Sequence, residues 1–177
     1  MHRITSVTVL VAATCLLPRG VLAQHEHQAS PYAGLESREI KALSAEQIAE
    51  YRSGEGMGLA LAAELNSYPG PRHTLDLAGP LELSSSQQAA VSGVMAVMER
   101  DARRLGGMLV ERERQLDRAF AGGTVDEAAL TTHTAVIARL QGELRWVHLR
   151  AHLEVRRVLT EEQVRRYDAL RGYRPSS

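Results

Sequence analysis

The feature that most constrains this chain is a pair of long amphipathic runs separated by one short break at Gly122-Gly123. In each run apolar residues recur every three or four positions, which places them on one face of an α-helix. The first run contributes Val91, Met95, Met98, Ala102, Leu105, Leu109 and Leu116. The second contributes Leu130, Ile137, Leu140, Leu144, Val147, Ala151, Val155 and Val158. The break is long enough only to reverse the chain, so an antiparallel helical hairpin is predicted between Ser84 and Leu159.

The composition indicates one thin, all-α domain. The chain has 177 residues, which is enough for one domain and short for two. Aromatic residues make up only 4%, so the large side chains that usually fill a thick core are scarce. Lys+Arg and Asp+Glu balance at 21 each, so no field of the whole chain would attract nucleic acid.

The N-terminus has the pattern of a secretory signal peptide over residues 1–23. A basic start precedes the apolar run from Ile4 to Leu17, and Val21-Leu22-Ala23 provides a small-residue cleavage site. Cleavage would remove Cys15, the only cysteine, and would leave no stable membrane span. Export to the periplasm is the interpretation favoured here, and a retained signal anchor is the alternative.

The remaining segments are predicted from turn and capping signals. Residues 24–35 show no periodicity and are expected to be a flexible tail. Residues 36–82 are expected to form short helices over about 36–51, 59–65 and 72–78, separated by glycine and proline turns. Residues 83–173 form the predicted hairpin domain. Its second long helix is expected to begin with a capping box at Thr124-Val125-Asp126-Glu127.

A pattern of Leu, then Ser or Thr, two residues and Gln occurs three times, from Leu43 to Gln47, from Leu83 to Gln87 and from Leu159 to Gln163. In each copy the hydroxyl of the second residue, which is Ser44, Ser84 or Thr160, can cap a helix, while the Gln closes a capping box. The preceding Leu can pack as a hydrophobic staple. The second and third copies bracket the predicted hairpin, whereas ordinary helix capping would account for any one copy alone.

The segments Leu83-Ser84-Ser85-Ser86-Gln87 and Leu159-Thr160-Glu161-Glu162-Gln163 resemble the paired LTxxQ motifs of the Spy/CpxP family. The resemblance covers about residues 83–173, and Ser84 replaces Thr in the first motif while keeping the cap chemistry. It implies an all-helical, cradle-shaped homodimer in the bacterial periplasm. It also implies an ATP-independent chaperone, an inhibitor of an envelope-stress sensor or a heavy-metal sensor, depending on the branch of the family.

Two sets of histidines are candidate metal ligands. His148 and His152 are four residues apart on the second long helix, so both project from one face and could bind Zn²⁺, Cu²⁺, Ni²⁺ or Co²⁺. His25 and His27 would lie near a processed N-terminus, where Cu²⁺ or Ni²⁺ could bind. The competing interpretations are surface or interface histidines for the first pair and a solvated tail for the second.

Methionines offer a softer alternative set. Met57, Met95, Met98 and Met108 could be read as ligands of Cu⁺, although Met95 and Met98 lie in the apolar stripe and are expected to serve packing. A divalent transition metal is thus left open, and no cofactor is required.

The last third of the chain is rich in arginine, which predicts a surface for binding unfolded proteins. Charge would speed capture, and neighbouring apolar groups would retain the bound chain. An ordinary solvated helix face is the alternative. The residues of this predicted client-binding face are Arg139, Arg145, Trp146, Arg150, Arg156 and Arg157.

The function expected from these features is an ATP-independent periplasmic chaperone or envelope-stress protein that binds unfolded envelope proteins or a stress-sensor domain. The alternatives are a heavy-metal sensor or metal-resistance protein acting through the histidines, and a structural adaptor with neither activity. Val94, Val97 and Met108 lie off the main apolar stripe, so an isolated hairpin would expose apolar surface on a second face. A homodimer that covers this face is therefore expected. No motif of a hydrolase or metalloprotease is present, so an enzyme is not expected.

Overall fold

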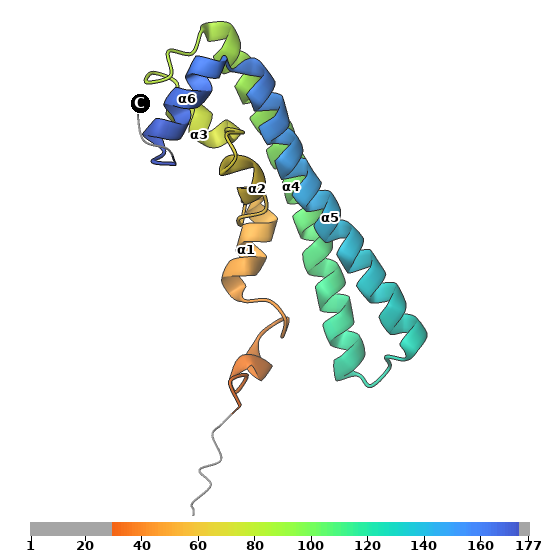
Figure 1. The fold of residues 1–177 in the computed structure, drawn as a ribbon. Coiled ribbons are helices and arrows are strands. Elements are labelled where there is room, and N and C mark those ends of the chain that lie inside the picture. The colour runs from red at the N-terminus through yellow and green to blue at the C-terminus, as the bar shows by residue number, and fades with distance from the viewer. Residues whose placement is uncertain (1–29, 174–177) are drawn as a thin grey trace, which may run out of the picture. The chain divides into compact units, whose positions relative to one another are not determined.

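The computed structural model describes residues 30–173, and the part from Gly34 onward forms one compact unit (Figure 1). This described part is all-α and contains no strand, as the sequence predicted. Its elements, in order, are the 3-10 helix η1 (Leu35–Ser37), then α1 (Ala45–Ser53), α2 (Leu61–Glu64), α3 (Pro71–Asp76), α4 (Ser85–Ala121), α5 (Glu127–Val158) and α6 (Glu161–Leu170). The predicted signal peptide, His25 and His27 lie outside the described residues.

Helices α4 and α5 form the predicted hairpin and dominate the unit (Figure 1). Ser84 caps α4, which ends at Ala121, and α5 ends at Val158, so three of the four helix boundaries lie where the motifs placed them. The prediction of a capping box at Thr124 is wrong. Asp126 caps α5 by accepting a hydrogen bond from the Ala129 backbone, because Thr124 is held by Ala119 at the end of the preceding helix.

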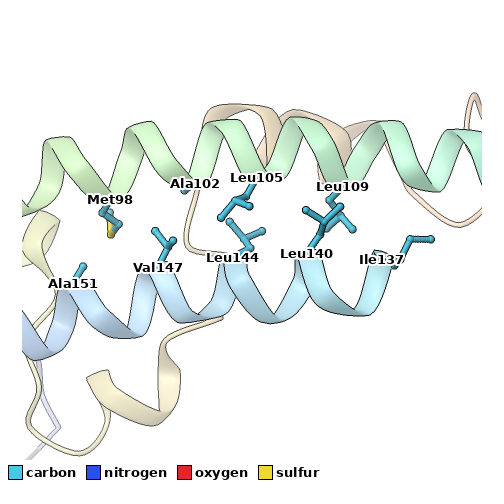
Figure 2. Packing of buried hydrophobic residues seen from close by; sticks show 9 residues of the cluster. All are labelled: Met98, Ala102, Leu105, Leu109, Ile137, Leu140, Leu144, Val147 and Ala151. Atoms are coloured by element: carbon cyan, nitrogen blue, oxygen red, sulfur yellow. The ribbon is translucent and has the colours of Figure 1, made fainter. Parts of the chain in front are cut away.

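The hairpin is held together by a ladder of buried apolar side chains from both helices (Figure 2). Met98, Ala102, Leu105 and Leu109 of α4 face Ile137, Leu140, Leu144, Val147 and Ala151 of α5. Because both sets follow the predicted stripes, the three-four periodicity identified most of this core correctly. Leu130, which was expected in the same stripe, is 38% exposed because it lies in the first turn of α5, beyond the buried cluster.

The short helices α1 and α3 pack against α4, and the chain approaches α4 most closely at Gly106. A Cβ added at Gly106 would lie 1.9 Å from the backbone oxygen of Tyr51 in α1. Only glycine therefore allows this approach. The helix predicted over 36–51 is shorter and later than expected, since α1 begins only after its cap at Ser44.

Helix α6 folds back at the open end of the hairpin and completes a second apolar cluster (Figure 1). Its buried members are Leu81, Leu83, Val91, Val155, Leu159, Val164 and Tyr167. This cluster joins the segment before α4 to the end of α5, so it closes the hairpin at the end opposite the Gly122-Gly123 turn. Among the described residues, no helix is both long enough and apolar enough to cross a bilayer.

Candidate functional site

The capping boxes of all three copies of the Leu-Ser/Thr-x-x-Gln pattern are present. At α4 the Gln87 backbone N–H donates to Ser84 Oγ (3.2 Å), and the Ser84 N–H donates to Gln87 Oε1 (3.0 Å). Thr160 and Gln163 repeat the same exchange at α6, with distances of 3.2 and 3.0 Å. Leu83 and Leu159, the predicted staples, are both buried. The motif residues therefore satisfy the orphan N–H groups at two helix starts.

The two hairpin motifs also bind each other through their glutamines. Gln87 Nε2 donates to Gln163 Oε1 at 2.8 Å, and Gln163 Nε2 donates to Gln87 Oε1 at 3.1 Å. The second amide hydrogens bond the carbonyls of Val158 (3.0 Å) and Leu81 (3.2 Å). Each amide thus uses both donors and both acceptor positions. Sequence analysis predicted each box separately but not this pairing, which needs the two motifs to meet in space.

His148 and His152 are buried on the side of α5 that faces the short helices, with 3% and 9% of their surface exposed. The interpretation of these residues as surface histidines is therefore wrong. His152 Nδ1 lies 2.6 Å from the carbonyl oxygen of Tyr68 and 3.7 Å from Glu64 Oε2. His148 Nε2 is buried without a hydrogen-bond partner.

Both histidines line a cavity of about 590 Å³ between α5 and the short N-terminal helices. The walls also include Glu64 of α2, Met57 of the preceding loop and Met98 of α4. Burial lowers the pKa of His148 below its ordinary value, and the neighbouring His152 lowers it further. Because the charged form is disfavoured, His148 is neutral at neutral pH.

Glu64 is the centre of a buried hydrogen-bond network that sequence analysis missed. Its Oε1 accepts hydrogen bonds from the phenols of Tyr167 (2.5 Å) and Tyr173 (3.0 Å) and lies 3.5 Å from the Arg171 guanidinium. Its Oε2 accepts from the backbone N–H of Gly70 at 3.1 Å. A single Glu on a four-residue helix carried no periodic signal, so only the fold reveals that it ties α2 to the C-terminal segment.

The buried phenol of Tyr167 titrates differently from an exposed tyrosine. Its ring is fully enclosed, and burial raises its pKa far above the usual value of about 10. Its hydrogen bond to the Glu64 carboxylate raises the pKa further, since ionisation would place two negative charges side by side. Tyr167 therefore remains a hydrogen-bond donor to Glu64 over the whole physiological pH range.

Within residues 30–173 no three His, Cys, Asp or Glu side chains are arranged to hold a metal ion. The cavity instead brings His148 and His152 together with two of the four predicted methionines, Met57 and Met98. Met108 is 41% exposed, and Met95 is only partly buried.

The predicted client-binding residues do not all share one side of α5. Arg139, Trp146, Arg150 and Arg157 lie together, whereas Arg145 and Arg156 lie roughly a quarter turn away, toward the histidines. Trp146 is 57% exposed and stacks with the guanidinium of Arg150, which lies 5.2 Å from the ring centroid. Arg139 and Arg150 form ion pairs with Glu143 and Glu154, each at 2.6 Å. These two glutamates offset part of the positive charge that the arginines give this surface.

Other members of this face differ in their pairing and surroundings. Arg156 pairs with Glu161, whereas no ion pair is recorded for Arg145 or Arg157 in the described part of the chain. Beside Trp146 and Arg150, a shallow groove is lined by Val94 and Val97 of α4. Trp146, Leu153 and Met108 leave large apolar areas in contact with solvent. The hairpin therefore presents an apolar and mixed-charge surface on the side away from the histidine cavity.

Comparison of the chain with protein-family models, with curated proteins and with solved structures found no match. A function must therefore be argued from the motifs, the cavity and the exposed hairpin surface.

Proposed function

We propose that this chain is an ATP-independent chaperone of the Spy/CpxP type that acts in the periplasm and binds unfolded envelope proteins or a stress-sensor domain. The observation that carries the proposal is the exposed α5 surface. There Trp146 and Leu153, 57% and 47% exposed, lie among arginines rather than under another helix. Trp146 and Leu153 are seven residues apart and so lie on the same side of α5, and exposed apolar groups that gather in one patch indicate an interaction site.

The rigidity of the hairpin supports this proposal. The Gln87–Gln163 pair joins the start of α4 to the start of α6, which directly follows α5. Two apolar clusters hold the rest of the hairpin together. A fixed helical surface can present apolar and charged groups without refolding for each bound chain. Loose retention of an unfolded chain requires only this kind of scattered contact, with charge accelerating encounter.

The test is suppression of aggregation of a chemically unfolded client by the full chain at a one-to-one ratio. Trp146→Ala should weaken suppression because it removes the largest exposed apolar group on the proposed face. Phe120→Ala is the matched control, since Phe120 is equally exposed at 57% but lies beside the hairpin turn. If the client aggregates to the same extent with a several-fold excess of the native chain as without it, the proposal is wrong.

We further propose that two copies associate through the hairpin, as the family resemblance implies. The partly buried Val97 and the exposed Met108 of α4 belong to neither buried cluster, whereas Val94 packs against both clusters. Light scattering at about 50 µM should yield twice the mass of one chain. A monomeric mass at this concentration would contradict the dimer while leaving the aggregation assay to judge the chaperone activity.

Sensing of Zn²⁺, Cu²⁺, Ni²⁺ or Co²⁺ remains the alternative function. One observation favours it, which is the burial of His148 and His152 around a cavity. Titration calorimetry with each ion, on the native chain and on a His148→Ala/His152→Ala variant, tests it. Absence of binding tighter than about 10 µM would remove this alternative.

A further inference from the structure

The histidine cavity has one feature that hydrogen bonding within the protein does not explain. His148 is 97% buried, as its 3% exposure shows, yet its Nε2 has no hydrogen-bond partner. Leaving a buried polar nitrogen unpaired is unfavourable, because the atom has lost its hydrogen bond to water. The atom belongs to a side chain that lines an open space of about 590 Å³, large enough to admit a ligand.

The other polar groups around the cavity are already engaged. Glu64 accepts from two phenols and from Gly70, and it faces Arg171 as well. His152 holds its Nδ1 against the carbonyl of Tyr68. Among the lining residues, His148 has a fully buried side-chain nitrogen without a hydrogen-bond partner, and Met57 and Met98 contribute thioethers.

We propose that this cavity binds a soft monovalent metal ion, Cu⁺ or its analogue Ag⁺, with His148 Nε2 as the nitrogen ligand and the sulfur atoms of Met57 and Met98 as the thioether ligands. Thioethers and imidazoles suit soft ions, whereas Zn²⁺, Ni²⁺ and Co²⁺ need more nitrogen, thiolate or carboxylate ligands than are arranged here. The site therefore differs in metal class from the divalent alternative.

The backbone at one proposed ligand fits this assignment. Met57 belongs to a short loop between Gly54 and Gly58 and adopts a positive φ of 44°. A non-glycine residue held in this conformation is strained, and such strain is concentrated at ligand-binding positions.

The ligands come from three separate parts of the fold. Met57 precedes α2, Met98 lies in α4 and His148 lies in α5. An ion bound between them would join the short N-terminal helices to the hairpin. Binding to the folded state alone would raise the melting temperature with increasing metal concentration.

The experiment measures Ag⁺ binding by thermal shift, and Cu⁺ binding by competition with a chromophoric Cu⁺ chelator under reducing conditions. Every protein carries Cys15→Ser, because a free thiol would itself bind these ions. Ag⁺ should raise the melting temperature of the parent, whereas Zn²⁺ at the same concentration should not. Met57→Leu, Met98→Leu and His148→Gln should each weaken binding by about tenfold or more, since loss of even an outer-shell partner typically weakens metal binding by about 10–100-fold.

Met108→Leu is the matched control, because it removes a thioether of α4 that does not line the cavity. His25→Ala/His27→Ala is the second control and excludes the N-terminal histidines. Both controls should bind Ag⁺ like the parent. Circular dichroism and the metal-free melting temperature establish that each variant is folded, and Met57→Leu, which changes a partly buried loop residue, decides the question if Met98→Leu unfolds the core.

Equal Ag⁺ binding by the parent, Met57→Leu and His148→Gln would overturn the proposal. Displacement of bound Cu⁺ by an equal concentration of Zn²⁺ would also overturn it. These results are independent of client binding. Met57→Leu should suppress client aggregation as well as the parent does, so failure of the metal site and failure of the chaperone proposal can be told apart.

Discussion

The side-chain amides of Gln87 and Gln163 donate to each other across the base of the hairpin, at 2.8 and 3.1 Å. Each glutamine also closes the capping box of its own helix. In addition, Gln87 donates to the carbonyl of Val158 at the end of α5, and Gln163 donates to the carbonyl of Leu81 before α4. One pair of residues thus fixes where α4 begins, where α6 begins and how the two ends of the hairpin meet. The repeat of the motif is explained by this mutual contact rather than by capping alone.

Replacing Gln163 by Ala should therefore destabilise the fold more than loss of an ordinary capping residue. It removes the bond to the Thr160 N–H, both bonds with Gln87 and the bond to the Leu81 carbonyl. We expect the free energy of unfolding to fall by about 2–3 kcal/mol, measured by urea denaturation. Gln47→Ala, in the box of α1, is the control and should cost only about 0.5–1 kcal/mol.

A double-mutant cycle isolates the contact between the two glutamines. Gln87→Ala, Gln163→Ala and the double variant should show a coupling free energy of about 1–2 kcal/mol. Additive effects would mean that the two boxes act independently, and the shared junction would then have no energetic role.

Gly106→Ala should loosen the packing of α1 against α4. The new Cβ would lie 1.9 Å from the Tyr51 carbonyl oxygen, so one helix must move. We expect a loss of about 1–3 kcal/mol, the usual size of overpacking strain, together with faster amide hydrogen exchange in α1.

Substitutions of two other helical glycines, one in α4 and one in α5, control for the effect of the glycine-to-alanine change on helix stability. Gly107 and Gly142 are helical and have open space where a Cβ would be. Gly107→Ala and Gly142→Ala should each raise the free energy of unfolding by about 0.5–1 kcal/mol, since glycine is the poorer helix former. A loss of stability in these variants equal to that of Gly106→Ala would point to helix propensity rather than a clash.

The hairpin was predictable from sequence because its signals are local and repetitive. The three-four periodicity located Leu105, Leu140 and Leu144 in the core, and the Ser84 and Thr160 boxes marked helix starts to within one residue. Competition between neighbouring caps was not predictable in the same way. Asp126 replaces Thr124 as the cap of α5 because Thr124 is already bonded to Ala119.

The candidate site was less accessible to sequence reasoning because its residues are far apart in the chain. Glu64 meets Tyr167 and Tyr173, and Met57 shares a cavity with His148, only after the short helices pack against the hairpin. The spacing of His148 and His152 indicated a shared helix face but not whether that face is buried.

The charge of the α5 surface should affect how fast clients are captured. Arg157 is exposed, lies on the Trp146 side of α5 and has no ion pair recorded in the described part of the chain. Arg157→Glu should therefore slow association with an acidic unfolded client, measured by stopped-flow fluorescence at low salt. Arg52→Glu makes the same charge change on α1 and should have a smaller effect. Equal slowing by both would indicate attraction by net charge rather than by this face, and the difference should shrink in high salt.

The Glu64 network should make the fold sensitive to alkaline pH. The pKa of Tyr167 is raised in the folded state, first by burial and then by Glu64, while the unfolded chain titrates near the usual value of about 10. Below pH of about 10 both states hold the proton and the contribution to stability is complete. Above it the unfolded state loses the proton first, so stability falls as pH rises, by up to about 1.4 kcal/mol per pH unit for this group.

Tyr167→Phe tests this dependence, because it removes the titrating phenol along with its bond to Glu64. The variant should be less stable at neutral pH but should lose less stability per pH unit above about pH 10, measured by urea denaturation at several pH values. Tyr173→Phe is the control. The pKa of Tyr173 is also raised by burial, but Tyr173 lies nearer the surface and its hydrogen bond with Arg171 opposes the rise, so its removal should change the slope less. An unchanged slope in Tyr167→Phe would show that other groups govern the alkaline loss.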